Sequence, residues 1–147
     1  MKKIILIVFV LCTALAFAQE NQPKIFDVTK ISNYSYLKTK IDLSDIPLLI
    51  DTLPEFPGGI NAFRTKVTQK INLFNFNSQG NRRLSTMIYF TIEKDGKMTN
   101  VIGVGHIKYS EAVEKGIRKI KDIWEPAKVN GEPVRYLFTL PLSIVFN

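Results

Sequence analysis

The chain has 147 residues, with 20 Lys or Arg against 13 Asp or Glu, a net charge of +7, one His and one Cys. This length favours a single domain, and one cysteine excludes an intramolecular disulfide framework. The basic residues are spread along the chain, which is typical of a solvated surface rather than of a nucleic-acid interface. We therefore expect a domain that is stabilised by its hydrophobic core and that binds no nucleic acid.

Residues 1–18 have the pattern of a secretory signal peptide. Two lysines follow the first residue, an apolar run comes next, and small residues precede a cleavage site after Ala18. The apolar run is shorter than the roughly 20 residues that a membrane-spanning helix needs. Cleavage would remove Cys12 and leave Gln19 at the new N-terminus. The sequence thus predicts export to the periplasm, with no stable membrane span after cleavage.

Residues 19–50 have neither a strand-like nor a helix-like period. We expect a loosely ordered lead-in here, with one short strand near residues 24–31. The regular part of the chain, and with it the folded domain, is expected over residues 51–147.

Pro57, Gly58 and Gly59 stand directly before the first helical pattern. A phosphate-binding loop would need a preceding strand and a spacing such as GxGxxG or GxxxxGK[ST], neither of which is present. Glycine instead permits the unusual backbone angles that the start of a helix can require. We therefore predict a helix start. The apolar stripe of this helix comprises Ile60, Phe63, Val67 and Ile71.

Residues 72–83 are rich in Asn and indicate a loop, and residues 84–93 then alternate like a strand. Asp95-Gly96 suits a tight turn because both residues tolerate positive φ angles. Residues 98–104 continue as the returning strand. The sequence therefore predicts a β-hairpin.

A second helix is expected from Ser110, a good N-cap residue, to the residue before Pro126. Its apolar stripe comprises Val113, Ile117, Ile120 and Trp124. A turn at residues 128–131 precedes a last strand at residues 134–146. Pro141 has no N–H to donate to a sheet, which places that part of the strand at an edge.

The order helix, strand, strand, helix, strand predicts an α+β two-layer sandwich, in which two helices cover a small antiparallel sheet. A strand at an edge leaves unpaired N–H and C=O groups that another strand can use.

The sequence contains no constellation that indicates an enzyme. His106 has no neighbouring ligands for a metal, and Ser110 lacks a nucleophile motif. Four carboxylates precede the regular domain without apolar enclosure: Asp42, Asp45, Asp51 and Glu55. Trp124 on an apolar stripe is typical of a core residue. We predict a non-enzymatic protein without cofactor or metal.

Three stretches taken together resemble the TonB C-terminal domain family, in the form found in exported proteins of Bacteroidetes-type bacteria. They are "LPEFPGGINAF" (residues 53–63), "IYFTIEKDGKMTNVIGV" (88–104) and "WEPAKVNGEPVRYLFTLPLSIVF" (124–146). The last stretch is the most specific, because its tryptophan, turn and closing strand follow in the family's order. The resemblance covers about residues 51–146 and implies the same α+β fold.

The resemblance also implies a periplasmic module that binds an extended segment of an outer-membrane transporter by adding it to the sheet edge. Full-length members carry an uncleaved inner-membrane helix and a proline-rich spacer, and this chain shows neither pattern. We therefore expect a binding module that is not coupled to the inner-membrane motor.

The last strand is the expected docking site for a protein partner. Its predicted partner-binding residues are Arg135, Tyr136, Leu137, Phe138 and Thr139. Main-chain hydrogen bonds would supply affinity, and alternate side chains would supply selectivity. The alternative is a structural or assembly protein that forms a homodimer through the same edge.

Overall fold

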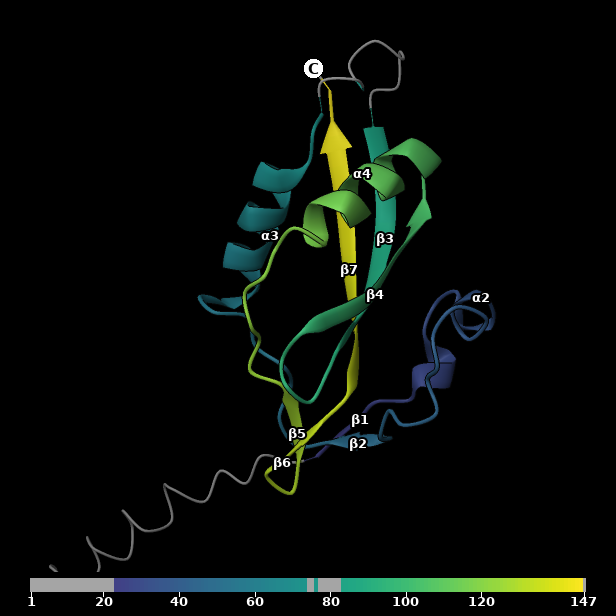
Figure 1. The fold of residues 1–147 in the computed structure, drawn as a ribbon. Coiled ribbons are helices and arrows are strands. Elements are labelled where there is room, and N and C mark those ends of the chain that lie inside the picture. Colours follow the sequence, from purple (N-terminus) through teal and green to yellow (C-terminus); the bar gives the residue numbers. More distant parts are fainter. Residues whose placement is uncertain (1–22, 74–75, 77–82, 147) are drawn as a thin grey trace, which may run out of the picture.

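The computed structural model describes residues 23–73, 76 and 83–146, and these residues form an α+β fold (Figure 1). The expected signal peptide and most of the expected loop at residues 72–83 lie outside the described residues. None of the helices within the described ranges is long and apolar enough to cross a membrane.

An antiparallel sheet of three strands forms the centre of the molecule. The strands are β3 (Arg83–Ile92), β4 (Met98–Gly105) and β7 (Tyr136–Val145), and β3 lies in the middle. The predicted hairpin of β3 and β4 is confirmed. Its turn contains Gly96 at φ 79°, and an added Cβ there would lie 2.0 Å from the carbonyl oxygen of Trp124. Glycine is thus required both by the turn and by this close approach.

Two helices cover one face of the sheet: α3 (Gly59–Lys70) and α4 (Ile107–Ile117) (Figure 1). The predicted helix start at the two glycines is confirmed: the helix begins at Gly59, with Gly58 as the N-cap at φ 83°. Phe63 and Val67 are fully buried, whereas Ile60 in the first turn stays 38% exposed. The main core lies between these helices and the sheet.

The boundaries of α4 differ from the prediction. His106, not Ser110, caps the helix, and its Nδ1 accepts a hydrogen bond from the Tyr109 N–H at 3.4 Å. Ser110 is buried inside the helix, where its hydroxyl lies 2.7 Å from that of Thr86 on β3. Because the Ser110 hydroxyl is bound by Thr86 on the sheet, it does not serve as the helix cap.

The chain beyond α4 reaches the core without helical structure. Trp124 is 2% exposed, which confirms the expectation of a core residue, and its backbone N–H donates to the Gly96 carbonyl at 2.9 Å. Its ring lies 5.0–5.7 Å from those of Phe56, Phe63, Phe90 and Phe138. Such pairs contribute about 0.5–1.5 kcal/mol each beyond the area they bury. This cluster packs the segment that precedes α3 against the N-terminal half of β7.

A short hairpin of β5 (Ala127–Val129) and β6 (Glu132–Val134) leads into β7. Its turn has Asn130 at φ 51° and Gly131 at φ 80°, the angles that such a two-residue turn requires. The Asp51 N–H donates to the Lys128 carbonyl at 2.9 Å, so this hairpin also holds the chain that precedes α3.

The lead-in segment (residues 23–50) differs from the loosely ordered stretch that we expected. It contains β1 (Lys24–Ile25), a 3-10 turn η1 (Val28–Lys30), the single-turn helix α2 (Tyr34–Leu37) and β2 (Leu49–Ile50). Four of its buried residues form a second core on the face of the sheet opposite α3 and α4; they are Leu37, Ile41, Leu43 and Ile46, packed with Tyr89 and Leu137. The sheet is therefore covered on both faces along part of its length. A scan for regular periods misses this segment because its elements are too short to show one.

Candidate protein-binding edge

The position of β7 at the edge of the sheet is confirmed, since the strand order is β4, β3, β7. Within the described residues no strand pairs with the outer side of β7. In Figure 1, α3 lies beside β7 on the side away from β3. The edge therefore runs along the flank of α3.

Alternate residues of β7 direct their backbone groups toward this edge. The β3–β7 register is continuous, with Ser85 opposite Ser143. The Ser85 carbonyl accepts from the His106 N–H at 3.1 Å, on the β4 side. Because the N–H and C=O of a residue in an antiparallel ladder point to the same side, Ser143 must direct both groups away from β3.

A contact of Pro141 independently supports this orientation of the β7 backbone groups. Its carbonyl accepts from Nη1 of Arg64 on α3 at 3.3 Å, which places it on the outer side of β7. The outward residues are thus the odd-numbered ones: Leu137, Thr139, Pro141, Ser143 and Val145. The even-numbered residues are paired with β3.

The structure places the five expected docking residues in different roles. Tyr136 and Phe138 lie opposite Ile92 and Phe90, and their backbone groups belong to the ladder with β3. Leu137 points outward with its backbone, but its side chain is fully buried under the lead-in segment. Of the five, Thr139 alone combines outward backbone groups with an exposed side chain.

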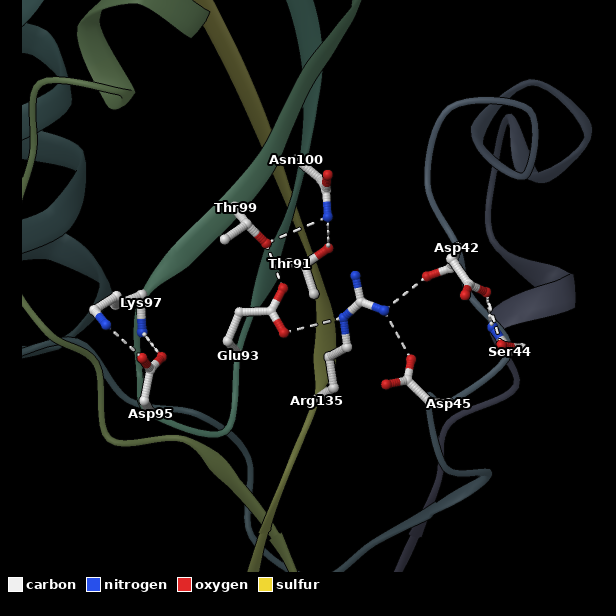
Figure 2. Close-up of polar contacts among 10 residues, drawn as sticks. All are labelled: Asp42, Ser44, Asp45, Thr91, Glu93, Asp95, Lys97, Thr99, Asn100 and Arg135. Atoms are coloured by element: carbon white, nitrogen blue, oxygen red, sulfur yellow. Dashed lines mark hydrogen bonds and ion pairs between the residues drawn. The ribbon is translucent and has the colours of Figure 1, made fainter.

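Arg135 precedes β7 and binds the lead-in segment. Its Nη1 donates to the Asp42 carbonyl at 2.9 Å and to Asp45 Oδ1 at 2.8 Å, and its Nε lies 3.2 Å from Glu93 Oε2 (Figure 2). Its side chain is only 13% exposed. Burial alone would lower the pKa of Arg135, but the bond to Asp45 and the charges of Glu93 and Asp45 raise it above the ordinary value. Arg135 is thus a fixed cation that joins the lead-in segment to the end of β3.

Tyr136 takes part in the same attachment. Its ring centroid lies 4.4 Å from that of Phe26 in the lead-in segment, and burial raises the pKa of its hydroxyl. The start of β7 therefore attaches the lead-in segment to the sheet. The exposed edge begins at Thr139. The exposed odd-numbered side chains beyond it are Pro141, Ser143 and Val145.

A hollow of about 530 Å³ adjoins this exposed part of β7. It lies mainly on the sheet face opposite α3 and α4, where Met87 and Val104 contribute apolar surface and Pro141 and Ser143 form its side toward the edge. Arg83 is the charged residue in its lining. A strand added to β7 would have alternate side chains next to this hollow.

At the opposite edge of the sheet, along β4, Glu114 of α4 and the C-cap residue Arg118 bind two outward backbone groups. The Gly103 N–H donates to Glu114 Oε1 at 2.7 Å, and Nη2 of Arg118 donates to the Val101 carbonyl at 2.5 Å. Glu114 and Arg118 also pair with each other at 2.9 Å. The outward backbone groups at these two positions of β4 are therefore already used.

The four acidic residues considered in the sequence have structural contacts. Asp42 accepts from the Ser44 N–H at 3.0 Å and from its hydroxyl at 2.7 Å, and these bonds lower its pKa. Asp45 binds Arg135, Asp51 accepts from the Asn130 N–H, and the Glu55 backbone pairs with that of Glu125. Asp42, Asp45 and Asp51 are thus held through their carboxylates, and Glu55 is held through its backbone.

Comparisons with protein-family models, curated proteins and solved structures find no match to this chain. The edge is therefore described by its own geometry. Two of its features were missed in the sequence: the alternation along β7 and the approach of Arg64. The first has a signal in the sequence, because a proline inside an edge strand must turn its missing N–H outward and so fixes the orientation of every second residue. The second depends on the packing of α3.

Proposed function

We propose that this protein is an exported, non-enzymatic binding module of the cell envelope, which takes an extended segment of another protein as an additional strand along β7. The resemblance of residues 51–146 to TonB C-terminal domains supports a partner in envelope transport, such as a segment of an outer-membrane transporter. The proposed location is the periplasm.

The observation that carries the proposal is the difference between the two sheet edges. Outward groups of β4 are bound by Glu114 and Arg118, whereas Thr139 and Ser143 of β7 have outward backbone groups and exposed side chains. Edge strands without protection readily accept another strand, and proteins usually cover or charge them. Within the described residues, two outward groups of β4 are occupied by side chains, while Thr139 and Ser143 of β7 pair with no further strand, so the β7 edge is suited to β-strand addition.

The test uses the chain from Gln19 to Asn147 and a display library of random nine-residue segments. A bound segment is synthesised and its affinity is measured for Thr139→Pro and for Thr139→Val. Proline removes an N–H that points outward and leaves the ladder with β3 intact, whereas valine keeps that N–H. We expect Thr139→Pro to bind at least about tenfold more weakly, because a main-chain hydrogen bond to the segment is lost and its register is disturbed. Thr139→Val should bind like the native chain. Equal affinity for the two variants, or a library without any binder, would refute the proposal.

The alternative partner is a second copy of the chain, because two β7 edges can pair with each other. Sedimentation equilibrium over a range of concentrations distinguishes the two. A monomer that binds the selected segment supports the proposed function. A tight dimer that Thr139→Pro dissociates supports self-association instead.

A further inference from the structure

Pro141 leaves a gap in the pairing edge. In an antiparallel or a parallel arrangement, the N–H of each outward residue of β7 donates to one carbonyl of an added strand. Thr139 and Ser143 can donate in this way, but Pro141 between them cannot. One carbonyl of the added segment would therefore face β7 without a donor, and an unsatisfied carbonyl in a closed interface weakens binding.

The Arg64 side chain lies at this gap. Its Nη1 is 3.3 Å from the Pro141 oxygen, a long and therefore weak hydrogen bond. In the described part of the chain, no carboxylate forms an ion pair with Arg64. A guanidinium has five N–H donors in a planar fork, so several remain for a ligand.

An added strand changes the partners of these groups. Its own N–H donates to the Pro141 carbonyl and replaces the weak bond from Arg64. The carbonyl of the same part of the strand would then lie beside the released guanidinium. Arg64 thus has the donor that Pro141 lacks, at the point where the lack arises.

We propose that Arg64 completes the pairing edge by donating to the main-chain carbonyl of the bound segment that faces Pro141. Arg64 is therefore a binding residue of this edge, although it belongs to α3 and not to the sheet. The ligand atom is a backbone oxygen, so the contact serves extended segments of any sequence that fit the edge. This inference rests on the proposed function.

The decisive experiment is a double-mutant cycle at Arg64 and Pro141 of the protein. The measured quantity is the affinity for the synthetic nine-residue segment selected by the native chain. Arg64→Met removes the donors, and Pro141→Ala restores the missing N–H. We expect Arg64→Met to weaken binding about tenfold, the effect of losing one hydrogen bond from a charged donor. In the Pro141→Ala background the same substitution should change affinity by less than about twofold, because the backbone then supplies the donor.

The matched control is Lys70→Met, which removes a positive charge from the same helix at a position that lines the space between α3 and α4 instead of the edge. Its affinity should equal that of the native chain. Urea denaturation of each variant shows whether the fold is kept.

The outcomes separate this inference from the proposed function. If Thr139→Pro abolishes binding and Arg64→Met does not weaken it, the edge binds segments but the role of Arg64 is wrong. A loss in Arg64→Met that persists in the Pro141→Ala background also overturns the inference, because it would reflect the structure of α3. Absence of any edge-dependent binder contradicts the proposed function itself.

Discussion

The two edges of the sheet show different solutions to the same physical problem. Along β4, Glu114 of α4 and the C-cap residue Arg118 bind the outward N–H of Gly103 and C=O of Val101. Along β7, the neighbouring helix α3 contributes one weak bond, from Arg64 to Pro141. An edge is thus protected or left available according to the side chains of the helix beside it. Glu114 and Arg118, four residues apart, lie one turn from each other and can reach successive backbone groups.

The largest effect is expected from substitutions that test the alternation along β7. Phe138→Pro removes an N–H from the ladder with β3 and an aromatic ring that lies 5.1 Å from Trp124 and 5.2 Å from Phe90. We expect a loss of about 3 kcal/mol or more in the free energy of unfolding. Thr139→Pro, one residue further, should cost less than about 1 kcal/mol. Urea denaturation of both variants measures the difference, and equal losses would contradict the assignment of outward and inward residues.

The next effect compares the two ends of β7. Arg135→Met removes the cation that binds Asp45, the Asp42 carbonyl and Glu93, but retains most of the apolar stem. We expect a loss of about 1–2 kcal/mol, because Arg135 is largely buried while Asp45 is half exposed. Hydrogen exchange should become faster in residues 33–46, with little change at residues 139–145. Uniform acceleration along β7 would show that the lead-in segment and the open edge are not independent.

A smaller effect on stability is expected at the β4 edge. Glu114→Ala frees the Gly103 N–H and releases Arg118 from its ion pair, at a cost of about 1 kcal/mol. The more informative result is association: an uncovered second edge should make the protein self-associate at lower concentration than the native chain. Lys115→Ala on the same helix is the control, since Lys115 lines the space between the helices instead. Unchanged sedimentation of Glu114→Ala would show that this carboxylate does not protect the edge.

The smallest effect concerns pH and the lead-in segment. Hydrogen bonds from Ser44, and then the charge of Arg135, lower the pKa of Asp42 from its ordinary value of 3.8. The contribution of the Asp42 carboxylate to the stability of the fold is therefore fully present above pH 3.8. It is lost as the pH falls through the lowered pKa of Asp42 in the folded state. Urea midpoints should decline below pH 3.8 more for the native chain than for Asp42→Ala. Parallel declines would mean that Asp42 does not contribute.

Much of the fold follows from local pattern. The alternation of residues 84–93 with Asp95-Gly96 predicted the hairpin, because a strand's period and a tight turn are properties of neighbouring residues. The two glycines predicted the start of α3 for the same reason. The predicted start of α4 was wrong, because the hydroxyl of Ser110 contacts the buried hydroxyl of Thr86 on β3, 24 positions earlier in the chain.

The candidate site was predicted in outline only. Pro141 correctly indicated an edge, but the choice of residues 135–139 included positions whose backbone is paired inward and an arginine that holds the lead-in segment. Register decides the first point and long-range ion pairing the second. Neither is visible from the spacing of residues within one strand.

The sequence by itself determined which segments become strands and helices and that the last strand lies at an edge, since these depend on local periodicity, turn residues and a missing N–H. Tertiary structure alone decided that the lead-in segment covers the second face of the sheet, that α4 protects the β4 edge, and that Arg64 reaches Pro141. The physical reason is distance along the chain: these contacts join residues that are 11 to 93 positions apart. Their geometry exists only after the core has brought the elements together.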